Sequence, residues 1–79
     1  MSVRNVAIVL FDEVEVLDFA GPFEVFSVAG SLGGEKTLNV YTVAEEMRVI
    51  QARGGLQVLP GYTLRDCPPP DIIVVPGGY

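Results

Sequence analysis

Two apolar runs, one near each end of the chain, constrain the fold more than any other feature. The predicted strand at 3–11 contains the run V-A-I-V-L-F, and the predicted strand at 71–75 contains I-I-V-V. Both runs are rich in β-branched residues, and neither alternates with polar positions. Such runs are typical of strands in parallel sheets, which are covered on both faces. The sequence therefore predicts an α/β fold with a parallel sheet.

A helix is predicted after the first strand. Its apolar positions recur at helical spacing, and Gly30 is suited to end it. Pro22 has no backbone N–H and would clash with the carbonyl of Asp18 in a helix. We therefore expect the helix to begin near Gly21 or to kink at Asp18. The apolar positions at helical spacing are Phe19, Phe23 and Phe26.

The middle of the chain predicts shorter elements. A polar loop at 31–36 leads to an alternating strand at 38–43, which completes a β-α-β unit. Two short extended runs, 49–52 and 56–59, flank a pair of glycines and so predict a hairpin. Residues 63–67 allow one helical turn before three consecutive prolines.

Size and charge exclude several classes of protein. The 79 residues suffice for one small domain at most, and one cysteine without histidine permits neither an internal disulfide nor a structural zinc site. A net charge of −5 with scattered basic residues argues against nucleic-acid binding. The apolar runs are far shorter than the ~20 residues of a membrane span, and no secretory signal is recognisable. A single unpaired cysteine favours the cytoplasm.

Candidate site residues follow the first and last strands. In open parallel sheets, ligands bind beyond the carboxyl ends of the strands. If the two strands are neighbours, Asp18 lies near Gly77 and Gly78, whose N–H groups could stabilise negative charge as an oxyanion hole does. The apolar neighbours Leu17 and Phe19 favour partial burial of Asp18, which suits a proton donor or acceptor. Alternatively, the acid-rich segment is a solvated turn and Pro-Gly-Gly is only a turn.

Other candidate sites are weaker. Cys67 precedes three prolines and has no helix N-terminus or placed cation beside it, so we interpret it as structural. No Gly-rich phosphate loop is present. Asp12 and Glu13 resemble the acidic pocket of receiver domains, but such a pocket needs another Asp where this chain has Pro-Gly-Gly.

Two motifs together resemble those of a known family. Residues 17–26 read L-D-x-x-G-P-x-E-V-F, and residues 74–78 read V-V-P-G-G. In this combination the chain resembles, from Val3 to Tyr79, the N-terminal part of the DJ-1/PfpI (ThiJ) superfamily. It is most similar to the isonitrile hydratase branch and to the ligand-binding domains of AraC-type regulators. V-V-P-G-G alone is less specific, because other class I glutamine-amidotransferase-like domains share it.

The resemblance implies a flavodoxin-like sandwich, usually homodimeric, with residues 1–79 as the N-terminal part of one domain. It implies that Asp18 hydrogen-bonds a nucleophilic cysteine, that the Gly78 N–H points toward this nucleophile, and that Gly77 belongs to the binding loop. Cys67 does not match the nucleophile, which in the family lies further along the chain. The chain alone is therefore expected to be inactive.

Three functions remain open at this stage. The intact protein is expected to be a cysteine-dependent hydratase or amidase acting on a small molecule without metal or cofactor. It could instead be the ligand-sensing domain of an AraC-type regulator. A non-catalytic remnant is the third possibility.

Overall fold

The main sheet brings the first and last predicted strands side by side. The computed structural model describes residues 3–78; Met1, Ser2 and Tyr79, which the predicted segment 1–79 includes, lie outside them. Within residues 3–78, four strands form the main sheet, one α-helix packs against it and two short strands form a hairpin. In chain order these elements are β1 (Arg4–Val9), α1 (Val16–Ala29), β2 (Leu38–Ala44), β3 (Ile50–Gln51), β4 (Gln57–Val58), β5 (Tyr62–Thr63) and β6 (Ile72–Val74).

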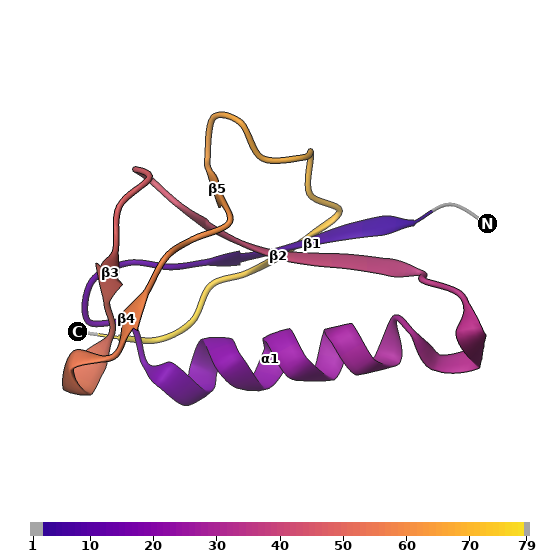
Figure 1. Cartoon of the computed structure of the whole chain (residues 1–79), viewed down its shortest axis with the longest axis horizontal. Helices are drawn as coiled ribbons and strands as arrows, with labels where there is room; N and C mark the ends of the chain where they lie inside the picture. Colours follow the sequence, from indigo (N-terminus) through magenta and orange to yellow (C-terminus); the bar gives the residue numbers. More distant parts are fainter. Residues whose placement is uncertain (1–2, 79) are drawn as a thin grey trace.

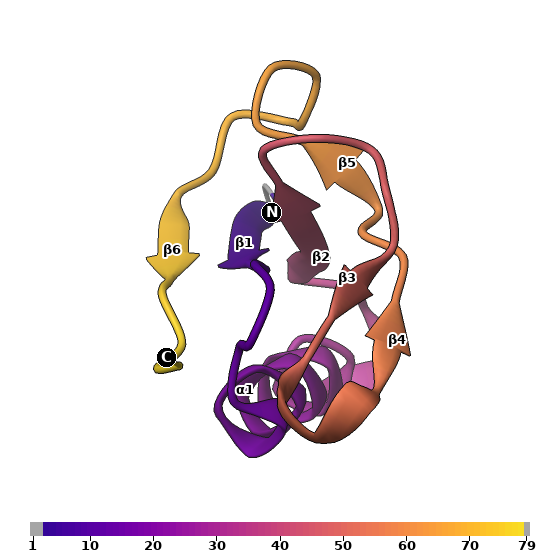
Figure 2. The same cartoon turned by 90° about the vertical axis from the view of Figure 1, so that its left-hand side faces the viewer.

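The sheet order is β5-β2-β1-β6, with every pair parallel. Strand β1 therefore lies at the centre, between β2 and β6 (Figure 2). The side chain of Asp71 fixes the register of β6, because it accepts the Asn5 N–H at 2.7 Å while Asn5 O accepts the Asp71 N–H at 2.8 Å. The first and last predicted strands are therefore neighbours, which is the condition that the sequence analysis set for a shared site.

The two faces of the sheet are covered differently. Helix α1 runs along one face, where Ile8 and Phe19 belong to the larger core cluster (Figure 1). On the opposite face, Tyr41 lies in a smaller cluster and donates a hydrogen bond from its hydroxyl to Pro68 O. That face is only partly covered, since Ile73, the partner of Ala7 in the register, is 60% exposed.

Helix α1 begins earlier than the sequence suggests. It starts at Val16, so the prediction of a start near Gly21 is wrong, and Pro22 lies inside one uninterrupted helix. Proline lacks the N–H that would bond the carbonyl of Asp18, and its ring crowds that carbonyl. Asp18 is exposed in the first turn, so water can satisfy that carbonyl.

Among residues 3–78, no helix has the length and apolar character needed to cross a membrane.

The predicted strands are present, four of them with shorter bounds, whereas β2 extends one residue beyond the predicted 38–43. Strands β3 and β4 are antiparallel, as the glycine pair predicts, and Gly54 and Gly55 between them have φ values of 86° and 91°. The segment 63–67 forms one turn through the Cys67 N–H and Thr63 O, and it is not part of a helix. Strand β5, which precedes this turn and extends the sheet, was not predicted.

Candidate functional site

The site is built around the turn between β1 and α1. Two apolar side chains of this turn, Leu10 and Val14, are buried in the core and hold it against the sheet. Glu13 adopts a φ of 69°, the left-handed conformation that reverses the chain direction. Val14 then pairs with Gly78 in an antiparallel bridge. The segment after β6 is thereby fixed beside the start of α1.

Asp18 and Glu15 bind the two backbone polar groups of Gly77. The Gly77 N–H donates to Asp18 Oδ2 at 3.2 Å, and Gly77 O accepts the Glu15 N–H at 2.9 Å. The Asp18 N–H in turn donates to Glu15 O at 3.2 Å. The predicted proximity of Asp18 to the glycine pair is therefore confirmed. Its chemical role remains a prediction.

The two glycines of the site differ in their surroundings. Added to Gly77, a Cβ atom would lie 2.9 Å from Asp18 Oδ2. Added to Gly78, it would lie 2.7 Å from Phe11 Cε1 and 2.8 Å from Glu13 O. Asp18 already takes the Gly77 N–H, whereas no acceptor among residues 3–78 takes that of Gly78. The predicted role of the Gly78 N–H beside a nucleophile stays a prediction.

Asp18 is more exposed than the sequence suggests. We expected partial burial between Leu17 and Phe19, but the structure places Asp18 at the surface. Phe19 is indeed buried, whereas Leu17 is 80% exposed, because consecutive helix positions point in different directions. The apolar neighbours along the sequence therefore do not cover the carboxylate.

Two ion pairs connect this turn to the β3–β4 hairpin. Arg48 Nη2 lies 2.9 Å from Asp12 Oδ2, and Arg53 Nη1 lies 2.8 Å from Glu15 Oε1. Asp12 Oδ1 also accepts the Gln51 N–H at 3.0 Å. Sequence reasoning missed both arginines. The only signal was their position beside the runs of the predicted hairpin, which is compatible with many other pairings.

The contacts of Asp12 affect its protonation. Hydrogen bonds from the Arg48 guanidinium and, to a lesser extent, from the Gln51 N–H hold the pKa of the Asp12 carboxyl below its ordinary value. The same ion pair raises the pKa of Arg48. Asp12 is therefore an anionic anchor for the hairpin and is unsuited to exchange protons near neutral pH.

Cys67 lies away from the site. Its half-buried side chain packs against the smaller core cluster, on the sheet face opposite α1. Its thiol is directed to Leu64 O at 3.8 Å. This placement supports the interpretation of Cys67 as a structural residue. No group of three or more metal-ligating side chains occurs between residues 3 and 78.

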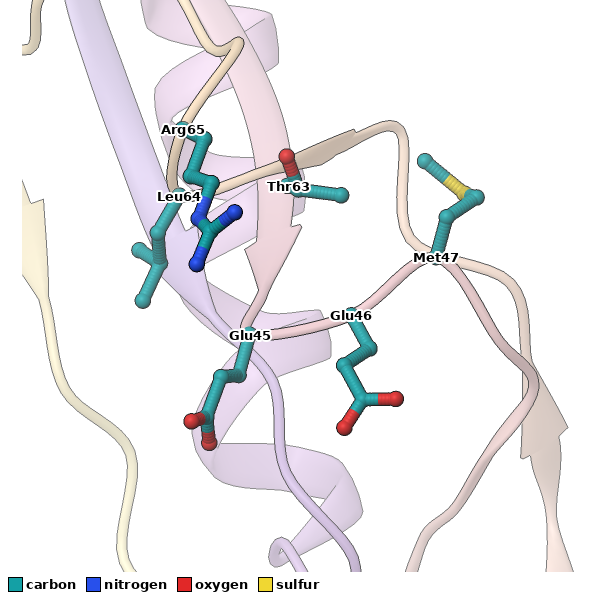
Figure 3. Close-up of a pocket in the computed structure, with 6 residues that line it drawn as sticks. All are labelled: Glu45, Glu46, Met47, Thr63, Leu64 and Arg65. Carbon is teal, nitrogen blue, oxygen red and sulfur yellow. The ribbon is translucent and has the colours of Figure 1, made fainter.

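A cavity of about 610 Å³ opens beyond the carboxyl ends of β2 and β5 (Figure 3). Figure 3 shows Arg65 extending from one wall, while Glu45 and Glu46 extend from the other. No residue of the Asp18–Gly77 pair borders it. Its lining residues are Glu45, Glu46, Met47, Thr63, Leu64 and Arg65.

Comparison with known proteins assigns the chain to a family. The sequence model of the DJ-1/PfpI family matches residues 4–79. The chain belongs to the DJ-1/PfpI family. It is 34% identical over 74 residues to the isonitrile hydratase of Pseudomonas putida, and the match covers 94% of this chain and 30% of that protein. The chain thus spans less than a third of this relative.

Solved structures of other proteins share the fold. A THiJ/PfpI family protein from Pseudomonas syringae is 28% identical, with a TM-score of 0.77 over 99% of this chain and 30% of that one. An AraC family transcriptional regulator from Pseudomonas putida is 17% identical, with a TM-score of 0.78 over 96% of this chain and 48% of that one. The second match shows likeness of fold alone. The predicted flavodoxin-like α/β class is confirmed.

Proposed function

We propose that residues 1–79 are the N-terminal part of a single DJ-1/PfpI domain that hydrates isonitriles, with Asp18 as the proton-transfer residue. The observation that carries this proposal is the hydrogen bond between Asp18 and the Gly77 N–H, beyond the carboxyl ends of β1 and β6. The chain order reverses between these two strands, which is where open α/β sheets bind ligands. The 34% identity to an isonitrile hydratase supports the choice of substrate class.

The proposed reaction needs a cysteine thiolate from outside residues 3–78, because Cys67 packs on the opposite face of the sheet. Asp18 takes the thiol proton, and the thiolate attacks the isonitrile carbon to form a C–S bond. Asp18 then returns the proton to that carbon, which gives a thioimidate. Water adds to the C=N bond, the C–S bond breaks, and an N-substituted formamide leaves. The Gly78 N–H stabilises negative charge that develops beside it.

The test compares the 79-residue chain with a longer form that includes the rest of the domain. The chain alone is expected to show no turnover, and the longer form is expected to hydrate an isonitrile. Asp18→Ala in the longer form should lower kcat about 100-fold or more, the range of general acid–base catalysis. Glu24→Ala, which truncates an exposed acid on the same helix, is the control and should leave kcat unchanged. Full activity of Asp18→Ala would reject the role of Asp18.

The same experiment separates the alternative functions. A longer form that shows no turnover but carries a helix-turn-helix module would indicate a ligand-sensing domain. A longer form with neither turnover nor such a module would indicate a non-catalytic remnant. Either result would reject the hydratase proposal.

We further propose that the protein is a homodimer in the cytoplasm. The outer side of α1 carries three exposed apolar side chains, Leu17, Val25 and Val28, which are 80%, 64% and 54% exposed. They lie along one stripe of one helix, so a two-fold axis across the helix would match the stripe with its own copy. The free thiol of Cys67 supports a reducing compartment.

A further inference from the structure

We propose that Arg53 is a positioning residue for the Asp18–Gly77 pair and acts through Glu15. The catalytic use of this pair rests on the proposed function, whereas the positioning itself can be tested without turnover. Arg53 lies on the β3–β4 hairpin, 35 positions along the chain from Asp18. Its hydrogen bonds to Val14 and Glu15 give its influence a path to the pair.

Arg53 holds the turn before α1 by its backbone and by its side chain. Its N–H donates to Val14 O at 3.0 Å, and its Nη1 donates to Glu15 Oε1 at 2.8 Å. These contacts bind two consecutive residues of the turn, Val14 and Glu15. Val14 is fully buried, so the backbone contact is anchored to the core, while the ion pair controls the orientation of Glu15.

Glu15 passes this restraint to the site. Its N–H donates to Gly77 O, and its carbonyl accepts the N–H of Asp18. The peptide unit before Glu15 thus contacts Gly77, and the peptide unit after Glu15 contacts Asp18. A shift of Glu15 would change the distance between the Gly77 N–H and Asp18 Oδ2, which at 3.2 Å is already at the long end of the usual range.

Arg48 provides a matched comparison within the same hairpin. It also pairs with a carboxylate of the turn, and its side chain is about as exposed as that of Arg53, at 50% against 48%. Its partner Asp12, however, makes no hydrogen bond to Gly77 or Asp18 among the contacts of residues 3–78. Loss of Arg48 should loosen the hairpin without disturbing the pair.

The test measures hydrogen exchange of the Gly77 amide by NMR in the 15N-labelled protein, relative to the Leu10 amide. Leu10 donates to Val43 O in the core and reports general loosening. In Arg53→Gln, the exchange rate of the Gly77 amide should rise about two- to fivefold more than the exchange rate of the Leu10 amide. An effect of this size is expected for an exposed ion pair. Glu15→Gln should give the same effect. Arg53→Lys, which keeps the charge, should restore most of the protection.

The control is Arg48→Gln, in which Gly77 exchange should follow Leu10. Equal effects of Arg48→Gln and Arg53→Gln on Gly77 would show that the hairpin acts only on overall stability, and would overturn the proposal. Unchanged Gly77 exchange in both Arg53→Gln and Glu15→Gln would also overturn it. The measurement does not depend on turnover. If Asp18 had no role in catalysis, neither of these two contradicting results would follow from that fact.

Discussion

Gly77 and Gly78 are adjacent, but a side chain would meet a different obstacle at each. At Gly77 the obstacle is the carboxylate of Asp18, the end of an exposed side chain that can rotate away. At Gly78 the obstacles are the ring of Phe11 and a backbone carbonyl, which cannot move without shifting the turn. A side chain at the first glycine would therefore disturb the Asp18 carboxylate, and one at the second would disturb the packing of the turn.

Alanine substitutions should separate these two roles. Gly77→Ala should displace the Asp18 carboxylate and lower turnover of the longer form, with a change in unfolding free energy within about 0.5 kcal/mol. Gly78→Ala should cost about 1–3 kcal/mol through overpacking. Denaturant unfolding of both variants, together with the isonitrile assay, checks this difference. A larger stability loss in Gly77→Ala than in Gly78→Ala would contradict it.

At the scale of single residues, the sequence predicted that Asp18 lies near Gly77. It did not predict the ion pair between Glu15 and Arg53 that lies beside them. Asp18 and Gly77 could be placed together because both follow apolar strands whose carboxyl ends meet at one edge of the sheet. The ion pair of Glu15 with Arg53 could not be predicted. It depends on where the hairpin docks, and no local pattern fixes the docking. The exposure of Asp18 was missed because flanking apolar residues in a helix point elsewhere.

At the scale of elements, the hairpin depends partly on the charge of Asp12. The pKa of the Asp12 carboxyl lies below its ordinary value of 3.8, chiefly because Arg48 hydrogen-bonds the carboxylate. A lowered folded-state pKa means that the stabilisation is present above pH 3.8 and is lost as pH falls through the lower folded value.

This dependence predicts a pH-sensitive difference between the wild type and Arg48→Gln. The wild type should be the more stable protein near pH 7, and the difference should shrink as pH falls below 3.8. High salt at pH 7 should also reduce it, because the pair is exposed and screened. Denaturant unfolding across this pH range checks the prediction. A difference that stays constant with pH would show that the ion pair does not carry the effect.

The elements that the sequence predicted correctly carry strong local signals. Strands β1 and β6 lie in continuous apolar runs, and the hairpin has a glycine pair at its turn. Strand β5 has only two residues, and it forms because Tyr62 and Thr63 pair with Val43 and Ala44, far away in the chain. The helix start was misplaced because Pro22 was taken as incompatible with a preceding turn, whereas Pro22 lies inside the helix that begins at Val16.

At the scale of the whole molecule, apolar surface remains uncovered on two sides. One is the outer stripe of α1, formed by Leu17, Val25 and Val28, and the other is the sheet face that includes Ile73. The sequence analysis predicted a family with larger, usually dimeric members, and this chain spans 30% of the isonitrile hydratase that it resembles. Both surfaces are therefore candidates for contacts beyond residues 3–78.

The dimer proposal predicts a specific loss of association. Val25→Glu places a charge in the middle of the stripe and should convert the dimer to a monomer in sedimentation velocity experiments. Leu32→Glu is the control, because Leu32 is 70% exposed in the loop after α1 and outside the stripe. A wild-type monomer, or a dimer that survives Val25→Glu, would reject this interface.

The central claim is that Asp18 transfers a proton beside the glycine loop, and Asp18→Asn tests it most directly. The asparagine amide oxygen can still accept the Gly77 N–H, so the loop keeps its position, but the side chain can no longer take up a proton. We predict that kcat for isonitrile hydration by the longer form falls in Asp18→Asn about as far as in Asp18→Ala, roughly 100-fold or more. Wild-type turnover in Asp18→Asn would contradict the account and leave Asp18 with a positioning role only.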